Sequence, residues 1–228
     1  DNCTCVKNND CTDAEMNKIA LPNSGTYGLA ITPSGSLWVS RYLRDGVSFI
    51  PDPDGAGSSN MVNYLGNDLA NNYGIGTDKM GVAYVNKYGS ADDNYTWRIT
   101  PGGAAVKLSG SGAPESTNRR GVGIDRRGAI WIVNEDDDYV ERLVGNLVVA
   151  RVGNASQLQG PFGVSGDSAG YVWAISGHHA PENKQVCRFV IPGTTQLAEG
   201  EEPASSESGI CWKTTVSAVS RAWPYMYS

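Results

Sequence analysis

Glycines and short apolar runs alternate along this chain in a pattern that occurs four times. Each copy has a glycine, six residues, a second glycine, two residues, and then Trp or Tyr inside an apolar run. The copies are Gly28–Gly35–Trp38, Gly74–Gly81–Tyr84, Gly121–Gly128–Trp131 and Gly163–Gly170–Trp173. By subtraction, successive first glycines are 46, 47 and 42 residues apart. A period of about 40–50 residues that carries strand pairs is typical of a β-propeller blade.

Each copy divides into four short strands, most clearly in the third. There the apolar runs cover residues 120–127, 129–136, 138–145 and 146–153, and turn-forming residues separate them. Gly145-Asn146 between two apolar runs is a signal for a tight hairpin turn. The sequence therefore predicts an all-β fold, a β-propeller of four-stranded antiparallel blades with four blades evident.

The repeated residues have mechanical roles in such a blade. The first glycine opens the innermost strand, where blades crowd around the axis and a side chain would clash. The second glycine lies in the turn to the next strand, where a positive φ is expected. The large aromatic residue fills the wedge between adjacent blades. We therefore expect Trp38, Tyr84, Trp131 and Trp173 to serve packing.

The two ends of the chain predict a partial closing blade. Residues 17–22 match the fourth-strand segments of the repeats and stand just before the first inner strand. Too few residues follow the fourth repeat to supply three more strands. We expect residues 1–16 to form a cysteine-containing N-terminal segment and residues 17–228 the propeller domain, with five or more blades in the complete assembly. A continuation of the chain or a partner chain would complete the ring; the competing arrangement is a compact four-blade ring.

Composition excludes two classes of partner. The chain has 228 residues, of which 40% are hydrophobic and 18% charged, and this suits a globular protein with a core. Its net charge is −6 without a basic block, so we expect no nucleic-acid partner. No apolar run reaches the roughly 18 residues of a membrane span.

The five cysteines form two groups, with Cys3, Cys5 and Cys11 at one end and Cys187 and Cys211 near the other. Cys187 falls in the third strand of the fourth blade and Cys211 in the fourth strand, so their side chains would be hairpin neighbours. We predict a Cys187–Cys211 disulfide and a second bond within the first group. This usage indicates a secreted, extracellular or periplasmic protein.

The phrases GVGIDRRGAIWIVNE (121–135) and GPFGVSGDSAGYVWAIS (160–176) resemble the NHL-type and streptogramin-lyase-type repeat of β-propellers. The resemblance covers about residues 27–198 and implies the blade rather than a chemistry. Streptogramin lyases place catalytic histidines on separate blades, beside an acidic residue and a magnesium ion. Here the only histidines are the neighbours His178 and His179, so the lyase chemistry does not carry over.

Two sets of loops emerge on one face of a propeller, those entering the first strand and those joining the second and third strands. In this chain they collect aromatic residues, both signs of charge and the histidines. Loops on a rigid scaffold commonly carry function, although polar turns also occur without one. The candidate ligand-binding residues are Tyr27, Arg41, Tyr42, Tyr73, Tyr88, Arg120, Glu135, Phe162 and His178.

One acidic turn is a candidate metal site. Residues 134–138 hold four carboxylates, and oxygen ligands from Glu135, Asp136 and Asp138 are of the kind that Ca²⁺ takes. The turn lacks the spacing of an EF-hand loop, and a solvated acidic hairpin is the alternative. No other cofactor is predicted.

Two classes of function fit these features. The first is a secreted binding or assembly module that recognises a glycan, peptide or partner subunit at the loop face. The second is a propeller enzyme, a lyase or hydrolase that uses His178, Glu135 and a divalent cation. The chain has no Gly-x-Ser-x-Gly nucleophile motif, and no cysteine has a base beside it in the pattern. The sequence favours binding.

Overall fold

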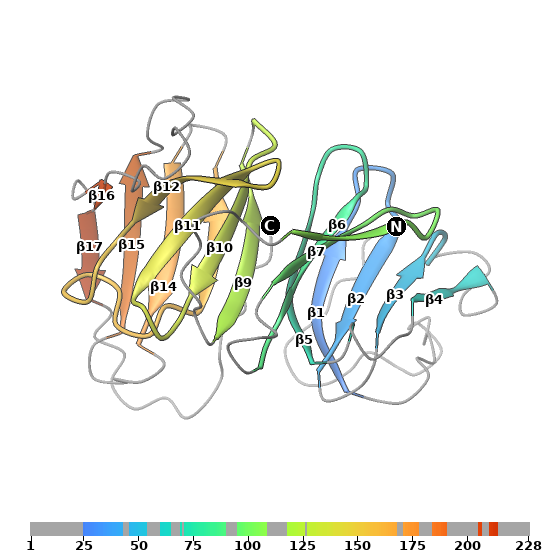
Figure 1. The fold of residues 1–228 in the computed structure, drawn as a ribbon, viewed down its shortest axis with the longest axis horizontal. Helices are drawn as coiled ribbons and strands as arrows, with labels where there is room; N and C mark the ends of the chain where they lie inside the picture. Colours follow the sequence, from blue (N-terminus) through green and yellow to red (C-terminus); the bar gives the residue numbers. More distant parts are fainter. Residues whose placement is uncertain are drawn as a thin grey trace, which may run out of the picture.

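The protein folds into four β-sheets, as the computed structural model shows (Figure 1). The structure describes residues 25–42, 46–53, 60–64, 69, 71–89, 95–108, 118–125, 127–167, 171–177, 184–190, 205–206 and 210–213. Within these ranges no helix is long and apolar enough to cross a membrane.

Each sheet corresponds to one copy of the sequence pattern. Blade 1 contains β1 (Thr26–Ile31), β2 (Leu37–Arg41), β3 (Val47–Ile50) and β4 (Val62–Tyr64). Blade 2 contains β5 (Asn72–Thr77), β6 (Ala83–Lys87), β7 (Thr96–Ile99) and β8 (Ala105–Leu108). Blade 3 contains β9 (Arg119–Ile124), β10 (Ile130–Asn134), β11 (Tyr139–Val144) and β12 (Leu147–Val152). Blade 4 contains β13 (Gly163–Gly166), β14 (Tyr171–Ser176), β15 (Gln185–Val190) and β17 (Ile210–Lys213).

These pairings are antiparallel throughout, which confirms the predicted four-stranded blades. Blade 3 carries one addition that the sequence did not suggest. The short strand β16 (Ser205–Ser206) pairs in parallel with the outer strand β12. The segment between the third and fourth strands of blade 4 thus reaches the outer edge of blade 3.

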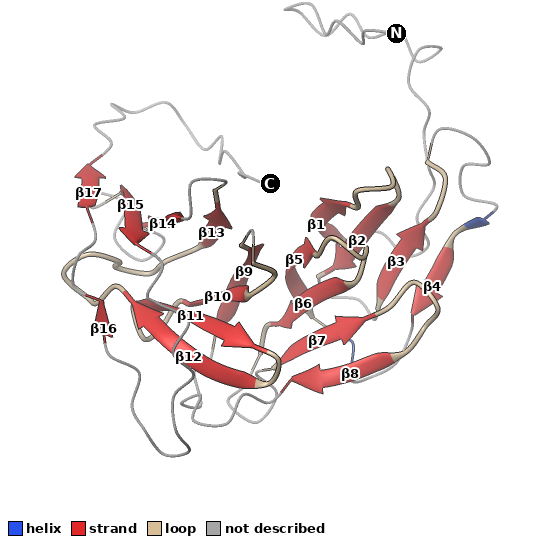
Figure 2. Cartoon of the chain, turned by 90° about the horizontal axis from the view of Figure 1, so that it is seen from above, coloured by secondary structure: helices blue, strands red, loops and turns tan. Residues whose placement is uncertain are grey.

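The four blades fan out from their inner strands, which lie side by side in chain order as β1, β5, β9 and β13 (Figure 2). The result is a propeller in which the four described sheets do not close into a ring. Among the described strands, none lies between β13 and β1. Residues 210–213 complete blade 4 as predicted, while the proposed closing strand at 17–22 lies outside the described residues.

Close approach of the inner strands explains the first glycine of the pattern. A Cβ atom built on Gly28 would lie 2.8 Å from the carbonyl oxygen of Tyr73 on the next blade. No side chain fits at that distance, so glycine is required. The second glycine serves the turn, since Gly128 has a φ of +80°.

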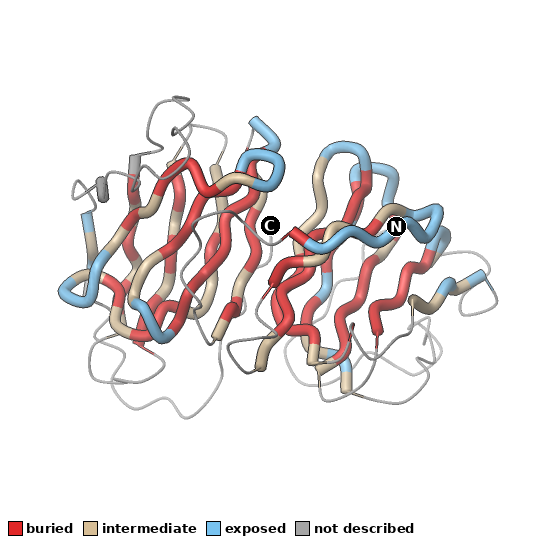
Figure 3. Tube along the Cα trace, viewed as in Figure 1, coloured by how far each residue is buried: buried red, intermediate tan, exposed pale blue. Residues whose placement is uncertain are grey.

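Three apolar cores fill the wedges between successive blades. Trp38 packs with Ile75, Tyr84 with Val122, and Trp131 with Val164. Figure 3 shows the buried stretches along the middle strands, with exposed stretches at the turns. The packing role predicted for Trp38, Tyr84 and Trp131 is therefore confirmed.

In three of the four blades, an aspartate six residues before the aromatic residue of the repeat fixes the turn between the first and second strands. Oδ2 of Asp125 accepts a hydrogen bond from Nε1 of Trp131 at 3.1 Å, and its Oδ1 accepts two from backbone amides of the turn. Asp167 and Trp173 repeat the pair at 2.7 Å, and Asp78 accepts from the hydroxyl of Tyr84 at 3.1 Å. Each aspartate satisfies buried donors, which anchors the wedge residue to its own turn.

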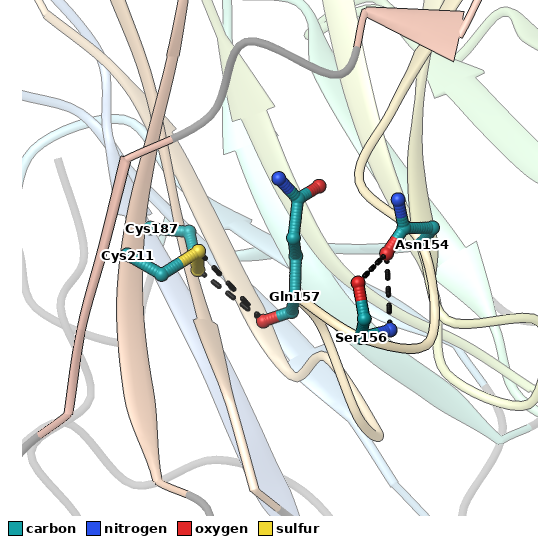
Figure 4. The surroundings of a disulfide bond; sticks show 5 residues. All are labelled: Asn154, Ser156, Gln157, Cys187 and Cys211. Carbon is teal, nitrogen blue, oxygen red and sulfur yellow. Dashed lines mark hydrogen bonds between the residues drawn. A yellow bond between two sulfur atoms is a disulfide. The ribbon is translucent and has the colours of Figure 1, made fainter.

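The Cys187–Cys211 disulfide is present, as predicted. The two residues are directly opposite one another on β15 and β17, with Cα atoms 4.1 Å apart. Their sulfur atoms lie 3.3 and 3.9 Å from the carbonyl oxygen of Gln157. Figure 4 shows this oxygen facing the disulfide. The disulfide thus holds the outer strand of blade 4 in register. Cys3, Cys5 and Cys11 lie outside the described residues.

Candidate binding site

The candidate site lies where the inner strands begin and the second strands end. Strand register sets its position: Thr26 faces Arg41 across β1 and β2, Asn72 faces Lys87 across β5 and β6, and Arg119 faces Asn134 across β9 and β10. The residues that follow these pairs therefore meet at one end of the inner strands. The two loop sets identified in the sequence do share one face.

Five aromatic side chains from blades 1, 2 and 4 gather at this end, and we call them the aromatic cluster. Its members are Tyr27, Tyr42, Tyr73, Tyr88 and Phe162. Tyr73 is central, with ring centroids 3.7 Å from Tyr27, 5.3 Å from Tyr42, 5.4 Å from Tyr88 and 5.9 Å from Phe162. The hydroxyl of Tyr27 also donates a hydrogen bond to that of Tyr73. Tilted and edge-on geometries of this kind are favourable for aromatic pairs.

A buried ion pair lies against the aromatic cluster. The guanidinium carbon of Arg120 lies 4.4 Å from the ring centroid of Tyr73, 4.5 Å from that of Tyr88 and 5.4 Å from that of Phe162. Nε of Arg120 donates to Oε2 of Glu135, a fully buried carboxylate. The arginine thus has aromatic faces around it and a carboxylate beside it.

These contacts shift the pKa values of Arg120 and Tyr88. Burial lowers the pKa of Arg120, but the hydrogen bond and the charge of Glu135 more than offset it, so this pKa lies above its usual range. Burial raises the pKa of Tyr88; the charge of Arg120 acts against this rise. At neutral pH the site therefore holds an arginine cation and neutral Tyr88.

Accessibility divides the aromatic cluster into a floor and a rim. Tyr73 is buried and forms the floor, while Tyr27, Tyr42, Tyr88 and Phe162 are half-buried and form the rim. The rim combines apolar ring surface with phenol hydroxyls, and the charges of Arg120 and Glu135 beside it offset each other. A surface of this type suits an uncharged ligand that has both apolar faces and hydroxyl groups.

Seven of the nine predicted ligand residues are brought together here. They are Tyr27, Tyr42, Tyr73, Tyr88, Arg120, Glu135 and Phe162. Arg41 is buried at the end of β2 and offers almost no accessible surface. His178, together with its neighbour His179, lies outside the described residues.

The three predicted metal ligands hold different protein partners. Glu135 pairs with Arg120, Asp136 accepts two hydrogen bonds from the amide of Asn118 at 3.0 and 2.8 Å, and Asp138 accepts one from the backbone of Gly160 at 2.7 Å. Across the described ranges, no three histidine, cysteine or carboxylate side chains form a group that could hold a metal ion. A calcium ion at this turn stays a prediction.

Two positioning residues were not singled out in the sequence. Oγ of Ser40 donates to the carbonyl of Tyr73 at 2.6 Å, and Nδ2 of Asn86 donates to the carbonyl of Arg120 at 3.0 Å. Each stands two residues after the aromatic residue of its repeat, Trp38 or Tyr84. A polar residue at that position of the repeat was the signal that could have identified them. They tie blade 1 to Tyr73 of blade 2 and blade 2 to Arg120 of blade 3.

No protein-family model matches the sequence, and no curated protein matches it. Solved structures do. Virginiamycin B lyase from Staphylococcus aureus, in a catalytically inactive form with quinupristin, aligns with a TM-score of 0.64 at 17% identity. The chain is a β-propeller of this structural type. This alignment covers 86% of the chain but only 59% of that lyase, so the chain spans less than two thirds of its length.

Two further structures support the same fold. A streptogramin B lyase aligns with a TM-score of 0.54 at 12% identity, covering 87% of this chain and 72% of that one. A putative gluconolactonase aligns with a TM-score of 0.56 at 13% identity, covering 76% and 61%. The resemblance to the streptogramin-lyase repeat is thus confirmed for the fold.

Proposed function

We propose that this protein is a secreted binding module that recognises a ligand through the aromatic cluster. The observation that carries the proposal is the convergence of Tyr27, Tyr42, Tyr88 and Phe162 into one half-buried rim around Tyr73. A set of rings drawn from three blades offers a preformed surface. The disulfide in blade 4 supports a site in an oxidising compartment.

Among a glycan, a peptide and a partner subunit, the chemistry of the rim favours a glycan. Aromatic faces pack on the apolar faces of sugar rings, and phenol hydroxyls exchange hydrogen bonds with sugar hydroxyls. The charges of Arg120 and Glu135 beside the rim offset each other, and the carboxylate of Asp136, which also acts on Tyr88, does not favour an acidic ligand. We therefore infer a neutral oligosaccharide rather than an acidic or basic one.

The test is a screen on immobilised neutral and acidic oligosaccharides, followed by calorimetric titration of the sugars that bind. Replacing both rim tyrosines, Tyr42→Ala with Tyr88→Ala, should weaken binding by about tenfold or more, because aromatic anchors dominate binding surfaces. The melting temperature should change by only a few degrees, since half-buried rim side chains contribute little to stability.

Tyr139→Ala is the matched control, because Tyr139 is a half-buried tyrosine of blade 3 outside the cluster. It should leave affinity unchanged. Equal affinity of the double variant and the wild type, or binding of no neutral sugar, would exclude this function for the rim.

A propeller enzyme that uses a divalent cation is the second candidate. The fold neighbours favour it, since they include virginiamycin B lyase and a putative gluconolactonase. The catalytic role suggested for His178 and Glu135 would require Glu135 to leave Arg120. A stoichiometric metal ion in purified protein, measured by mass spectrometry, would support this candidate over the binding module.

A further inference from the structure

The turn between β12 and β13 carries an Asn-x-Ser triplet that the aromatic cluster does not use. Asn154, Ala155 and Ser156 form this triplet, and all three residues are exposed. An Asn-x-Ser or Asn-x-Thr triplet without a central proline is the acceptor sequence for N-glycosylation in secreted proteins. The chain holds two more such triplets, which begin at Asn2 and Asn94.

The side-chain amide of Asn154 is oriented by the third residue of its own triplet. Its Oδ1 accepts one hydrogen bond from the backbone nitrogen of Ser156 at 3.0 Å and another from the hydroxyl of Ser156 at 2.6 Å. Both bonds go to the oxygen, and Figure 4 shows Nδ2 of Asn154 pointing away from Ser156. The hydroxyl of the triplet therefore contacts the amide that would be modified, while the nitrogen stays outside this contact.

The turn that presents this amide is anchored to the core. The backbone carbonyl of Asn154 accepts hydrogen bonds from the backbone nitrogens of Gln157 and Leu158, each at 2.8 Å. Leu158 is completely buried in the core between blades 3 and 4, and the carbonyl oxygen of Gln157 lies 3.3 Å from the sulfur of Cys187. The anchoring residues lie below the exposed triplet, so a bulky group on the amide of Asn154 would displace no buried side chain.

The triplet that begins at Asn94 is closed by comparison. Its second and third residues, Tyr95 and Thr96, are 4% and 0% exposed. The hydroxyl of Thr96 donates to Oδ1 of Asn86 at 2.7 Å inside blade 2. Asn94 itself and the first triplet lie outside the described residues. Of the two triplets whose hydroxyl residue is described, the one at Asn154 presents that hydroxyl at the surface.

We propose that Asn154 carries an N-linked oligosaccharide. The inference rests on the secretion in the proposed function, which the disulfide supports. The donor is an oligosaccharide on a polyprenyl diphosphate carrier. The bond from C1 of the first sugar to the diphosphate oxygen breaks, a bond from C1 to Nδ2 of Asn154 forms, and Nδ2 loses one proton as the diphosphate carrier leaves. Asn154 is no member of the aromatic cluster, so the ligand site does not depend on this glycan.

The test is secretion of the full chain from a eukaryotic host, followed by peptide mapping of the secreted protein by mass spectrometry. The peptide that contains Asn154 should carry a glycan that peptide-N-glycosidase removes, with aspartate left in place of asparagine. Asn154→Asp and Ser156→Ala should each abolish this glycan, whereas Ser156→Thr should keep it, because threonine also supplies the hydroxyl.

Asn154→Asp is the most informative variant, because its carboxylate can accept the same two hydrogen bonds from Ser156 and has no amide nitrogen. It should lose the glycan and keep the fold, as measured by circular dichroism. Asn146→Gln is the matched control, since Asn146 is an exposed turn residue of blade 3 outside any triplet. It should leave the glycan on Asn154 unchanged.

An unmodified Asn154 in the secreted protein would overturn the inference, and so would a glycan found only at Asn2 or Asn94. Binding of neutral oligosaccharides is measured separately, and Asn154→Asp should bind them with the affinity of the wild type. A glycosylated chain that binds no neutral sugar would contradict the proposed function alone. A chain that binds sugar but has an unmodified Asn154 would contradict this inference alone.

Discussion

At the scale of single residues, the site depends on one buried ion pair. Arg120 lies among three aromatic rings, and Glu135 beside it is completely buried. Glu135→Gln should destabilise the fold by about 3 kcal/mol, because breaking a buried pair leaves one charge without its partner. Urea denaturation would measure the loss. Arg120→Met with Glu135→Leu should recover most of it, and a double variant as unstable as the single one would contradict this account.

The sequence predicted which residues share the site, but not which side chains pair within it. The repeat placed Tyr27, Tyr73, Arg120 and Phe162 at equivalent positions, and that was enough to predict one shared face. It did not predict that Arg120 would pair with Glu135, since the choice of partner depends on side-chain reach. The same limit applies to Asp136 and Asp138. The acidic turn suggested calcium ligands, but it did not predict that these carboxylates would accept hydrogen bonds from Asn118 and Gly160.

At the scale of the strand and blade, the inner-strand glycine allows neighbouring blades to pack closely, because it has no side chain. Gly28→Ala places a methyl group 2.8 Å from the carbonyl oxygen of Tyr73 and 2.9 Å from a methyl group of Ile75. Relieving this overlap should cost about 1–3 kcal/mol. Thermal and urea melts would measure it, with Gly102→Ala as the control, because the nearest neighbour of a Cβ there is 4.0 Å away. Equal stability of both variants would show that the inner strands are not tightly packed.

Blade structure was the most predictable part of the molecule, because its signals are local. Hairpin turns, alternating apolar residues and the Gly-to-aromatic spacing defined the strands of all four blades, and the Cys187–Cys211 pair followed from their order. The parallel pairing of β16 with β12 was not predictable. It joins blades 3 and 4 through two serines that have no strand pattern of their own.

At the scale of the whole molecule, the four described blades form an arc. The aromatic rim lies at one end of its inner strands. The solved propellers that it resembles share only 12–17% identity with it. The fold therefore follows from the comparison, whereas the binding role depends on the side chains of the rim.

The most direct test of that role is an NMR titration of the protein with ¹³C-labelled tyrosine rings against a neutral oligosaccharide selected by the array screen. The account predicts saturable shifts in the ring signals of Tyr27, Tyr42 and Tyr88. The signals of Tyr64 and Tyr139, which lie outside the cluster, should stay in place. Shifts confined to tyrosines outside the cluster, or none at saturating sugar, would contradict the account.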